Sequence, residues 1–225
     1  MKKTLYLLFV FFVISHSWAQ YRQRYGITVG PNYSKFRGMD VSGLDYSYAP
    51  GLSLGIAYEY YLKENLSIKT NFFYENKKSK AVGELQMRQE VDSSPTVTET
   101  VVYSYQYITL PVMIQYHFKK AKGFFVNGGI FMGYLLDSEA KGEGDNALYA
   151  SVTDFTSSTF EYNNKFDFGF VLGAGKAFQL NPKNHLVVEV RNSHGVFQTN
   201  KNNTFDGNIV RSNSYALLLG WVYSK

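Results

Sequence analysis

The sequence predicts an all-β protein, an eight-stranded antiparallel up-and-down transmembrane β-barrel with short periplasmic turns and long extracellular loops. Three observations predict this class. Apolar residues alternate with small or polar ones in segments of about ten residues. Short and long connections between these segments also alternate along the chain. Aromatic residues make up 17% of the 225 residues, and outer-membrane barrels gather such residues at both membrane interfaces.

The composition excludes several other classes. The charged fraction of 18% is below the roughly 25% that is usual for soluble domains. The mean hydropathy of −0.23 argues against a bundle of membrane helices, and the aromatic content excludes a disordered chain. Because the chain has no cysteine, disulfides, thiolate metal sites and lipid attachment through an N-terminal cysteine are excluded.

Residues 1–19 predict a cleaved secretory signal peptide. Lys2 and Lys3 precede an apolar run over residues 5–14, and Ser17 and Ala19 place small residues before the cleavage point. The run is shorter than the roughly 20 residues of a membrane-spanning helix. Residues 20–225 are then a single barrel domain in the cell outer membrane. Its basic excess is too weak to predict a nucleic-acid partner.

Alternation identifies the strands. It is clearest in segments 52–59, 107–118, 166–175 and 214–224, and further strands are expected near 24–35, 66–77, 124–136 and 185–197. The faces expected to meet lipid are Leu52, Leu54, Ile56 and Tyr58; Ile108, Leu110, Val112, Ile114, Tyr116 and Phe118; Phe166, Phe168, Phe170 and Leu172; and Tyr215, Leu217, Leu219, Trp221 and Tyr223.

The connections alternate in length. Short turns are expected at 63–65, 119–123 and 181–184, and long polar loops at 37–50, 78–102, 137–164 and 198–211. Every second connection is long, so the four loops lie at one end of the sheet and both termini at the other, which we expect to be periplasmic. Loop 78–102 is expected to extend its strands as a hairpin.

Aromatic residues are expected to form a belt at each interface. The periplasmic belt comprises Tyr25, Tyr60, Tyr116, Phe118, Phe124, Trp221 and Tyr223, and the outer belt comprises Tyr33, Tyr74, Tyr134, Phe166 and Tyr215.

The segment 107–116, Tyr-Ile-Thr-Leu-Pro-Val-Met-Ile-Gln-Tyr, resembles the hallmark strand of the PorT-like outer-membrane β-barrel family of Bacteroidota. A short turn and a glycine-rich strand follow it in that family, matched here by residues 124–136 with Gly128, Gly129 and Gly133. The resemblance covers the mature chain and implies a barrel. PorT itself is a component of type IX secretion, and most of its relatives have no assigned role. Pro111 lacks an N–H, so we expect a bulge there.

Eight strands leave an interior that side chains nearly fill. Inward positions carry polar and charged residues, and a lumen charge network is expected from Glu59, Lys69, Glu189 and Arg191. A three-residue turn at 63–65 sets Glu59 opposite Lys69. Paired charges that plug the lumen are favoured over an ion or proton path, because buried charges are normally paired.

No catalytic, metal or cofactor site is expected. The mature chain has three histidines, His117, His185 and His194, which are separated in sequence and lack acidic residues at ligand spacing. Ser193 and His194 are adjacent on a strand and point to opposite faces, so they do not form a nucleophile and base pair. The sequence therefore favours a protein that is not an enzyme.

Basic residues cluster where the strands would meet the outer leaflet. Contact with lipopolysaccharide phosphates is expected from Lys77, Lys78, Lys80, Lys165 and Arg211, with solubilising surface charge as the alternative. The expected partners are outer-membrane lipid and lipopolysaccharide, and protein partners at the loops or in secretion machinery.

The function that these observations favour is structural or interaction-based. A barrel with a plugged polar lumen would act through its extracellular loops 78–102 and 137–164. The resemblance leaves open an accessory role in type IX secretion, and the barrel class leaves open a porin-like narrow solute channel.

Overall fold

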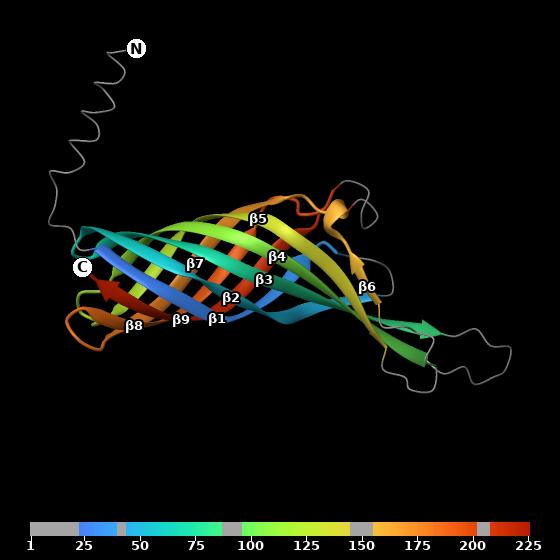
Figure 1. The fold of residues 1–225 in the computed structure, drawn as a ribbon, viewed down its shortest axis with the longest axis horizontal. Coiled ribbons are helices and arrows are strands. Elements are labelled where there is room, and N and C mark those ends of the chain that lie inside the picture. The colour runs from blue at the N-terminus through green and yellow to red at the C-terminus, as the bar shows by residue number, and fades with distance from the viewer. Residues whose placement is uncertain (1–22, 40–43, 87–95, 145–154, 202–207) are drawn as a thin grey trace, which may run out of the picture.

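The computed structural model describes residues 23–39, 44–86, 96–144, 155–201 and 208–225 (Figure 1). The expected signal peptide at 1–19 lies outside the described residues. The elements are β1 (Gln23–Arg37), β2 (Leu44–Lys63), β3 (Leu66–Gln86), β4 (Thr96–His117), β5 (Phe124–Gly144), β6 (Phe155–Ser158), the 3-10 turn η1 (Phe160–Tyr162), β7 (Phe166–Gln179), β8 (Asn184–Gly195) and β9 (Arg211–Ser224).

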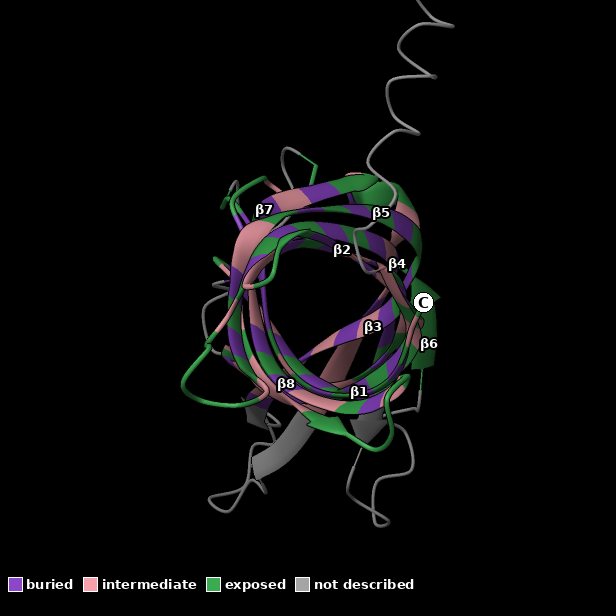
Figure 2. Cartoon of the chain, turned by 90° about the vertical axis from the view of Figure 1, so that its left-hand side faces the viewer, coloured by how far each residue is buried: buried purple, intermediate pink, exposed green. Residues whose placement is uncertain are grey.

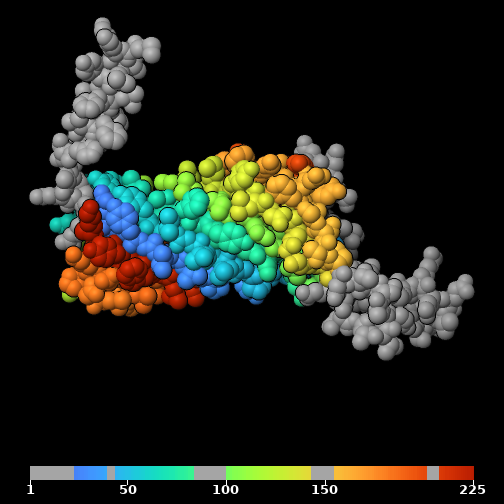
Figure 3. Space-filling view, in the orientation of Figure 1, coloured from blue at the N-terminus to red at the C-terminus, as the bar shows by residue number. Residues whose placement is uncertain are grey.

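Eight of these strands form a closed antiparallel ring. Around it the strands run in the order β4, β3, β2, β1, β9, β8, β7 and β5, and pairing between β4 and β5 closes the circle. The first and last strands, β1 and β9, lie side by side (Figure 3), and Figure 2 shows the ring from one end. The predicted up-and-down barrel is confirmed, with the short strand β6 added to β5.

Alternation along each strand separates an exposed apolar face from a buried interior. Ile114 is 62% exposed and Leu172 66%, whereas the neighbouring inward residues Met113 and Val171 are buried. Exposed apolar side chains surround the ring, as a wall in contact with hydrocarbon requires. Closure pairs every one of the eight strands on both sides, which is the condition for a sheet to cross a membrane.

The two ends of the barrel differ. At one end, here the turn end, β2 joins β3, β4 joins β5 and β7 joins β8 through the predicted short turns, and the C-terminal Lys225 lies there too (Figure 1). The β4–β5 turn needs Gly123, whose φ is +83° and whose missing Cβ would meet the Ala177 carbonyl oxygen. The opposite end, here the loop end, holds the longer connections.

The strands extend further at the loop end than the sequence predicted. Residues 44–49, 78–86, 96–102 and 137–144 were expected in loops and lie in β2, β3, β4 and β5. The hairpin predicted within 78–102 is confirmed, since β3 and β4 stay paired out to Gln86 and Thr96. These extensions run out beyond the rest of the ring at the loop end, on the right-hand side of Figure 1. The outer faces of these extensions are not continuously apolar, so the alternation of apolar and polar residues does not identify them as strands.

The prediction of a bulge at Pro111 is wrong. Pro111 pairs in register with Phe131 of β5, and pairing with β3 keeps one register on either side of it. The irregularities lie elsewhere: between Ala49 and Leu52 and between Tyr61 and Lys63 of β2, and between Gln106 and Tyr107 of β4. The Pro111 carbonyl oxygen accepts a hydrogen bond from Thr70 Oγ1 at 2.8 Å.

An apolar cluster fills the barrel at the loop end. This loop-end cap packs Phe36 of β1 against Tyr105 of β4, with ring centroids 4.0 Å apart. The buried members of the cap are Phe36, Met39, Tyr46, Ala81, Tyr105, Tyr107, Leu135 and Val210.

The only helical element in the described part of the chain is η1, a single turn. No helix there is long and apolar enough to cross a membrane.

Candidate functional site

The lumen below the loop-end cap holds charged side chains of both signs. Within the described residues, these are the buried carboxylates Glu59, Glu75, Asp167 and Glu189 and the buried cations Lys69, Lys77 and Arg191, with Arg24 and His117 half-buried near the turn end. Charges buried to this degree are tolerated only when partners surround them.

Glu189 of β8 is the centre of the middle layer. Its Oε2 lies 2.6 Å from Lys69 Nζ of β3, across the lumen. Its Oε1 accepts hydrogen bonds from Arg191 Nε at 2.8 Å and from Asn127 Nδ2 at 3.0 Å. Two cations and an amide therefore saturate one carboxylate that is almost completely buried.

The two cations of this layer are also held by aromatic rings. The Lys69 ammonium lies 5.1 Å from the Phe125 ring centroid, and the Arg191 guanidinium lies 5.4 Å from that of Phe73. Arg191 Nη2 also donates to Asn71 Oδ1 of β3 at 3.1 Å. The contacts of this layer therefore join β8 to β3 across the lumen.

Glu59 of β2 forms a second layer, nearer the turn end. Its Oε1 accepts hydrogen bonds from Ser67 Oγ at 2.6 Å and Gln115 Nε2 at 2.8 Å, and lies 2.7 Å from His117 Nε2. Its Oε2 faces Arg24 Nη1 at 3.7 Å. Gln115 also accepts from Asn127, which joins this layer to the middle one.

Glu59 and Lys69 lie opposite each other in the β2–β3 register, as predicted. The structure gives each of them a different partner, because Lys69 reaches across the lumen to Glu189 while Glu59 Oε1 is occupied by neighbours on β3 and β4. The structure thus brings Lys69, Glu189 and Arg191 into one cluster and links Glu59 to it through two amides.

Lys77 of β3 belongs to a third layer, beneath the cap. Its side chain is 1% exposed, and its Nζ lies 3.3 Å from Asp167 Oδ2 of β7 and 3.7 Å from Glu75 Oε2. Asp167 Oδ2 also accepts from Ser212 Oγ. The rings of Tyr107 and Phe131 flank the ammonium.

The expectation that Lys77 contacts lipopolysaccharide is therefore wrong. Lys77 lies at the predicted height along the strand but on the inner face, because it shares the odd parity of Lys69 and Glu75. This parity was available in the sequence and would have placed Lys77 inside. The other predicted contacts are on the outside: Lys78 and Lys80 are half-buried on β3, and Lys165 and Arg211 are exposed.

Arg211 stands opposite Arg37 in the β1–β9 register. Their guanidinium groups donate to neighbouring carbonyls, Arg211 Nε to Val196 at 2.9 Å and Arg37 Nη2 to Gly195 at 2.6 Å. Neither forms an ion pair within the described residues, although like charges directly opposite are unfavourable in a sheet.

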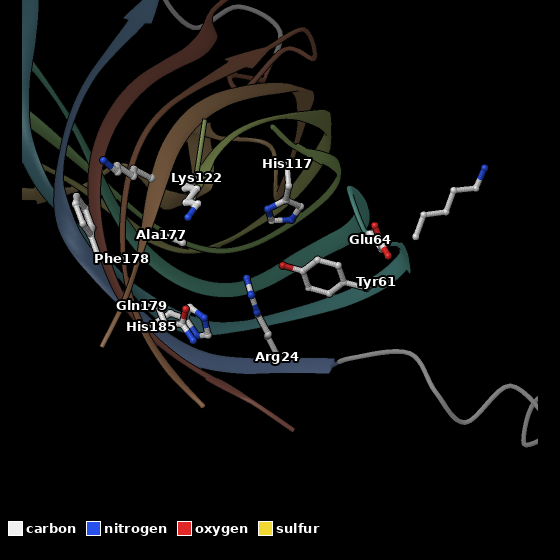
Figure 4. A pocket seen from close by; sticks show the side chains of 12 residues that line it. Arg24, Tyr61, Glu64, His117, Lys122, Ala177, Phe178, Gln179 and His185 are labelled. Atoms are coloured by element: carbon white, nitrogen blue, oxygen red, sulfur yellow. The ribbon is translucent and has the colours of Figure 1, made fainter. Parts of the chain in front are cut away.

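The lumen opens at the turn end into a cavity of about 880 Å³, here the vestibule. Arg24, Tyr61, His117 and Lys122 point into this opening (Figure 4). Beyond it lies a space of only about 20 Å³ beside Glu59 and Lys69, which is room for about one water molecule. The vestibule thus narrows sharply beside Glu59 and Lys69.

Ser193 and His194 pair in register with Ser214 and Asn213 of β9, respectively. His194 is exposed, and Ser193 is half-buried. Within the described residues, no group of three or more His, Cys, Asp or Glu side chains is arranged to hold a metal ion.

The closed ring, the lipid-facing apolar wall and the charged interior define an outer-membrane β-barrel protein. Residues 18–201 match the family described as outer membrane protein beta-barrel domain, so the chain belongs to this family. No curated protein matches the chain.

Solved barrels are similar at low identity. Neisserial surface protein A is 12% identical over 88% of this chain and 96% of its own, with a TM-score of 0.44. Ail of Yersinia pestis is 14% identical over 90% of this chain and 98% of its own, with a TM-score of 0.40. The outer membrane protease OmpT from Escherichia coli is 10% identical over 91% of this chain and 96% of its own, with a TM-score of 0.44. Likeness of this degree concerns the barrel fold alone.

Proposed function

We propose that this outer-membrane protein is a closed barrel that acts through its loop-end surface and does not conduct solutes. The observation that carries the proposal is the double closure of the lumen. Three layers of paired charges cross it, and the apolar loop-end cap seals it above them. An open pathway would require breaking ion pairs that are costly to leave unpartnered.

The proposed orientation places the turn end and both mature termini in the periplasm and the loop end outside the cell. Short turns on the periplasmic side and long connections outside are the rule for this class of barrel. Removal of residues 1–19 as a signal peptide on export is part of the same proposal.

The sheet extensions of β2, β3, β4 and β5 support a role in surface interaction. They place paired strands beyond the apolar belt, with β6 added at one side. Strands that stand clear of the membrane offer edges and side-chain rows to a partner protein. Nothing in this arrangement requires an enzyme activity, and the proposed role is non-catalytic.

The outer-wall cations Lys78, Lys80, Lys165 and Arg211 are proposed to contact lipopolysaccharide phosphates. Arg211 is the best supported of them, since the adjacent Arg37 adds a second positive charge that an anion would neutralise. Arg211→Gln should lower the lipopolysaccharide that co-purifies with the barrel. Unchanged co-purification in Arg211→Gln and in a Lys78→Gln/Lys80→Gln variant would refute the contact.

Conductance in planar bilayers tests the closed lumen. The purified full-length mature protein should give no stable current steps under voltages at which a porin control conducts. Reproducible steps in the wild-type protein would overturn the proposal in favour of a narrow solute channel.

A second candidate rests on segment 107–116, whose proline-containing strand resembles the PorT-like family of Bacteroidota. In this reading the barrel is an accessory component of type IX secretion. Deleting the gene in its native host and measuring secreted cargo tests it. Normal secretion would exclude this role and leave the surface role standing.

A further inference from the structure

The turn end carries far more positive than negative charge. Glu64 is the only carboxylate in its turns, and Glu59 lies just inside the ring. Residues 1–22 contain no Asp or Glu. The cations there are Arg24, Lys63, Lys119, Lys120, Lys122, Lys176, Lys183 and Lys225.

The vestibule concentrates part of this charge in a concave space. Arg24, Lys63, Lys122 and Lys176 contribute to its lining. Among the described residues, Glu64 is the only carboxylate that lines it, and its side chain pairs with Lys119 at 3.2 Å instead of with a vestibule cation. Lys122 forms no ion pair with a described residue and points into the opening (Figure 4).

Arg24 is held in place at the floor of the vestibule. Its Nε donates to Ser224 Oγ at 3.0 Å, and its guanidinium lies 4.9 Å from the Tyr61 ring centroid. Tyr61 in turn stacks on His117, with centroids 5.0 Å apart. The hydrogen bond and the two ring contacts orient Arg24, while its nearest carboxylate, Glu59, is 3.7 Å away and already accepts three other contacts.

We propose that the vestibule binds a small oxyanion, a carboxylate or phosphate group, that enters from the turn end. Arg24 presents planar N–H groups that suit two oxygen atoms of such a group, and Lys122 adds a mobile positive charge. Tyr61 gives the wall an aromatic surface, in keeping with the mixed lining of small-molecule sites. The space beyond the vestibule admits about one water molecule, so the ligand stops there.

This site is independent of the proposed surface function. It lies at the opposite end of the barrel from the sheet extensions, and a barrel that conducts nothing can still bind an anion in the vestibule. Failure of anion binding would leave the closed-lumen proposal intact, and channel activity would leave the anion site intact.

Calorimetric titration of the folded full-length mature protein tests the site. Micelles with uncharged headgroups and low ionic strength keep the electrostatic attraction measurable. The probes are inorganic phosphate and citrate, which distinguish the two oxyanion types. We expect one of them to bind with one-to-one stoichiometry, and Arg24→Gln and Lys122→Gln each to weaken that binding about tenfold or more, as losing a charged hydrogen-bond partner does.

Lys120→Gln is the matched control. Lys120 lies in the same turn as Lys122, is exposed and does not line the vestibule, so its loss should leave the affinity unchanged. Lys122 is also exposed in its turn, so Lys122→Gln should fold, which heat-dependent gel mobility checks.

Two results would overturn the proposal. One is no binding of either probe to the wild-type protein; binding to phosphatidylglycerol vesicles in that case would show that the lysines meet a lipid surface instead of a ligand in the cavity. The other is an equal loss of affinity in Lys120→Gln and Lys122→Gln, which would mean that the charge acts diffusely.

Discussion

Glu189 is the residue on which the lumen network converges. It accepts contacts from Lys69, Arg191 and Asn127, and removal of its charge would leave two buried cations without their carboxylate. The mutual attraction within such a cluster does little more than offset desolvation, but the loss of a single member is expensive. The cluster therefore matters most for specifying one arrangement of the lumen.

Glu189→Gln should destabilise the folded barrel by about 3–5 kcal/mol, because it keeps the shape and removes the charge from a buried ion pair. Urea unfolding in phospholipid vesicles, followed by Trp221 fluorescence, measures the change. Replacing Lys69 with Met in the Glu189→Gln background should recover part of the loss by removing one uncompensated cation.

Glu64→Gln is the control for this prediction. The Glu64–Lys119 pair is exposed, and surface pairs contribute less than about 1 kcal/mol. A Glu189→Gln variant that is no less stable than Glu64→Gln would mean that the lumen tolerates unpaired charge and is wetter than its burial indicates.

Among the elements, β5 depends on close backbone approach. A Cβ at Gly129 would lie 2.0 Å from the Val112 carbonyl oxygen of β4, whereas one at Gly128 would first meet the flexible end of Leu172 at 3.0 Å. The glycine-rich character of this strand thus has a steric cause at Gly129 and a weaker one at Gly128.

Gly129→Ala should therefore lower stability by about 1–3 kcal/mol through overpacking, and Gly128→Ala should change it much less. The folded fraction after refolding, read from gel mobility before and after heating, gives the comparison. Equal folded fractions for the two variants would contradict the steric account of β5.

The lipid-facing halves of the strands were predictable from sequence because they alternate without interruption. The wall residues expected in segments 107–118 and 214–224 lie outside as predicted. The hairpin within 78–102 was predicted, but the extension at 137–144 was not, since polar residues on its outer face remove the apolar signal. Their strands are held by pairing and by the buried cap.

The lumen residues were predictable as a set and not as pairs. Parity places Lys69, Lys77, Glu189 and Arg191 inside, but a partner across the lumen depends on strand tilt and on how the ring closes. The contact between Lys69 and Glu189 joins residues 120 positions apart, and cross-strand register cannot predict it because β3 and β8 are not neighbours.

At the scale of the whole molecule, the fluorescence of Trp221 can report how deep the barrel wall lies in the membrane. The chain has two tryptophans, and Trp18 lies in the expected signal peptide. Trp221 is on the outer wall near the turn end and is 48% exposed. Aromatic residues at such positions sit at the membrane–water interface.

Trp221 fluorescence should be quenched most by lipids brominated close to the headgroup. A Trp221→Phe/Leu217→Trp variant moves the fluorophore four residues along the same face, about 13 Å of strand, and should be quenched most by lipids brominated deeper in the acyl chain. Identical depth profiles would contradict the proposed position of the belt.

The contact between Lys69 and Glu189 across the lumen affects the kinetics of folding and unfolding. β3 and β8 lie on opposite sides of the ring, with β2, β1 and β9 between them one way and β4, β5 and β7 the other. Lys69 and Glu189 can meet only when the sheet has curled far enough to bring these walls together. If the rate-limiting step of insertion precedes that closure, removing the contact leaves the folding rate nearly unchanged and speeds unfolding. The lumen network would then slow the unfolding of the inserted barrel.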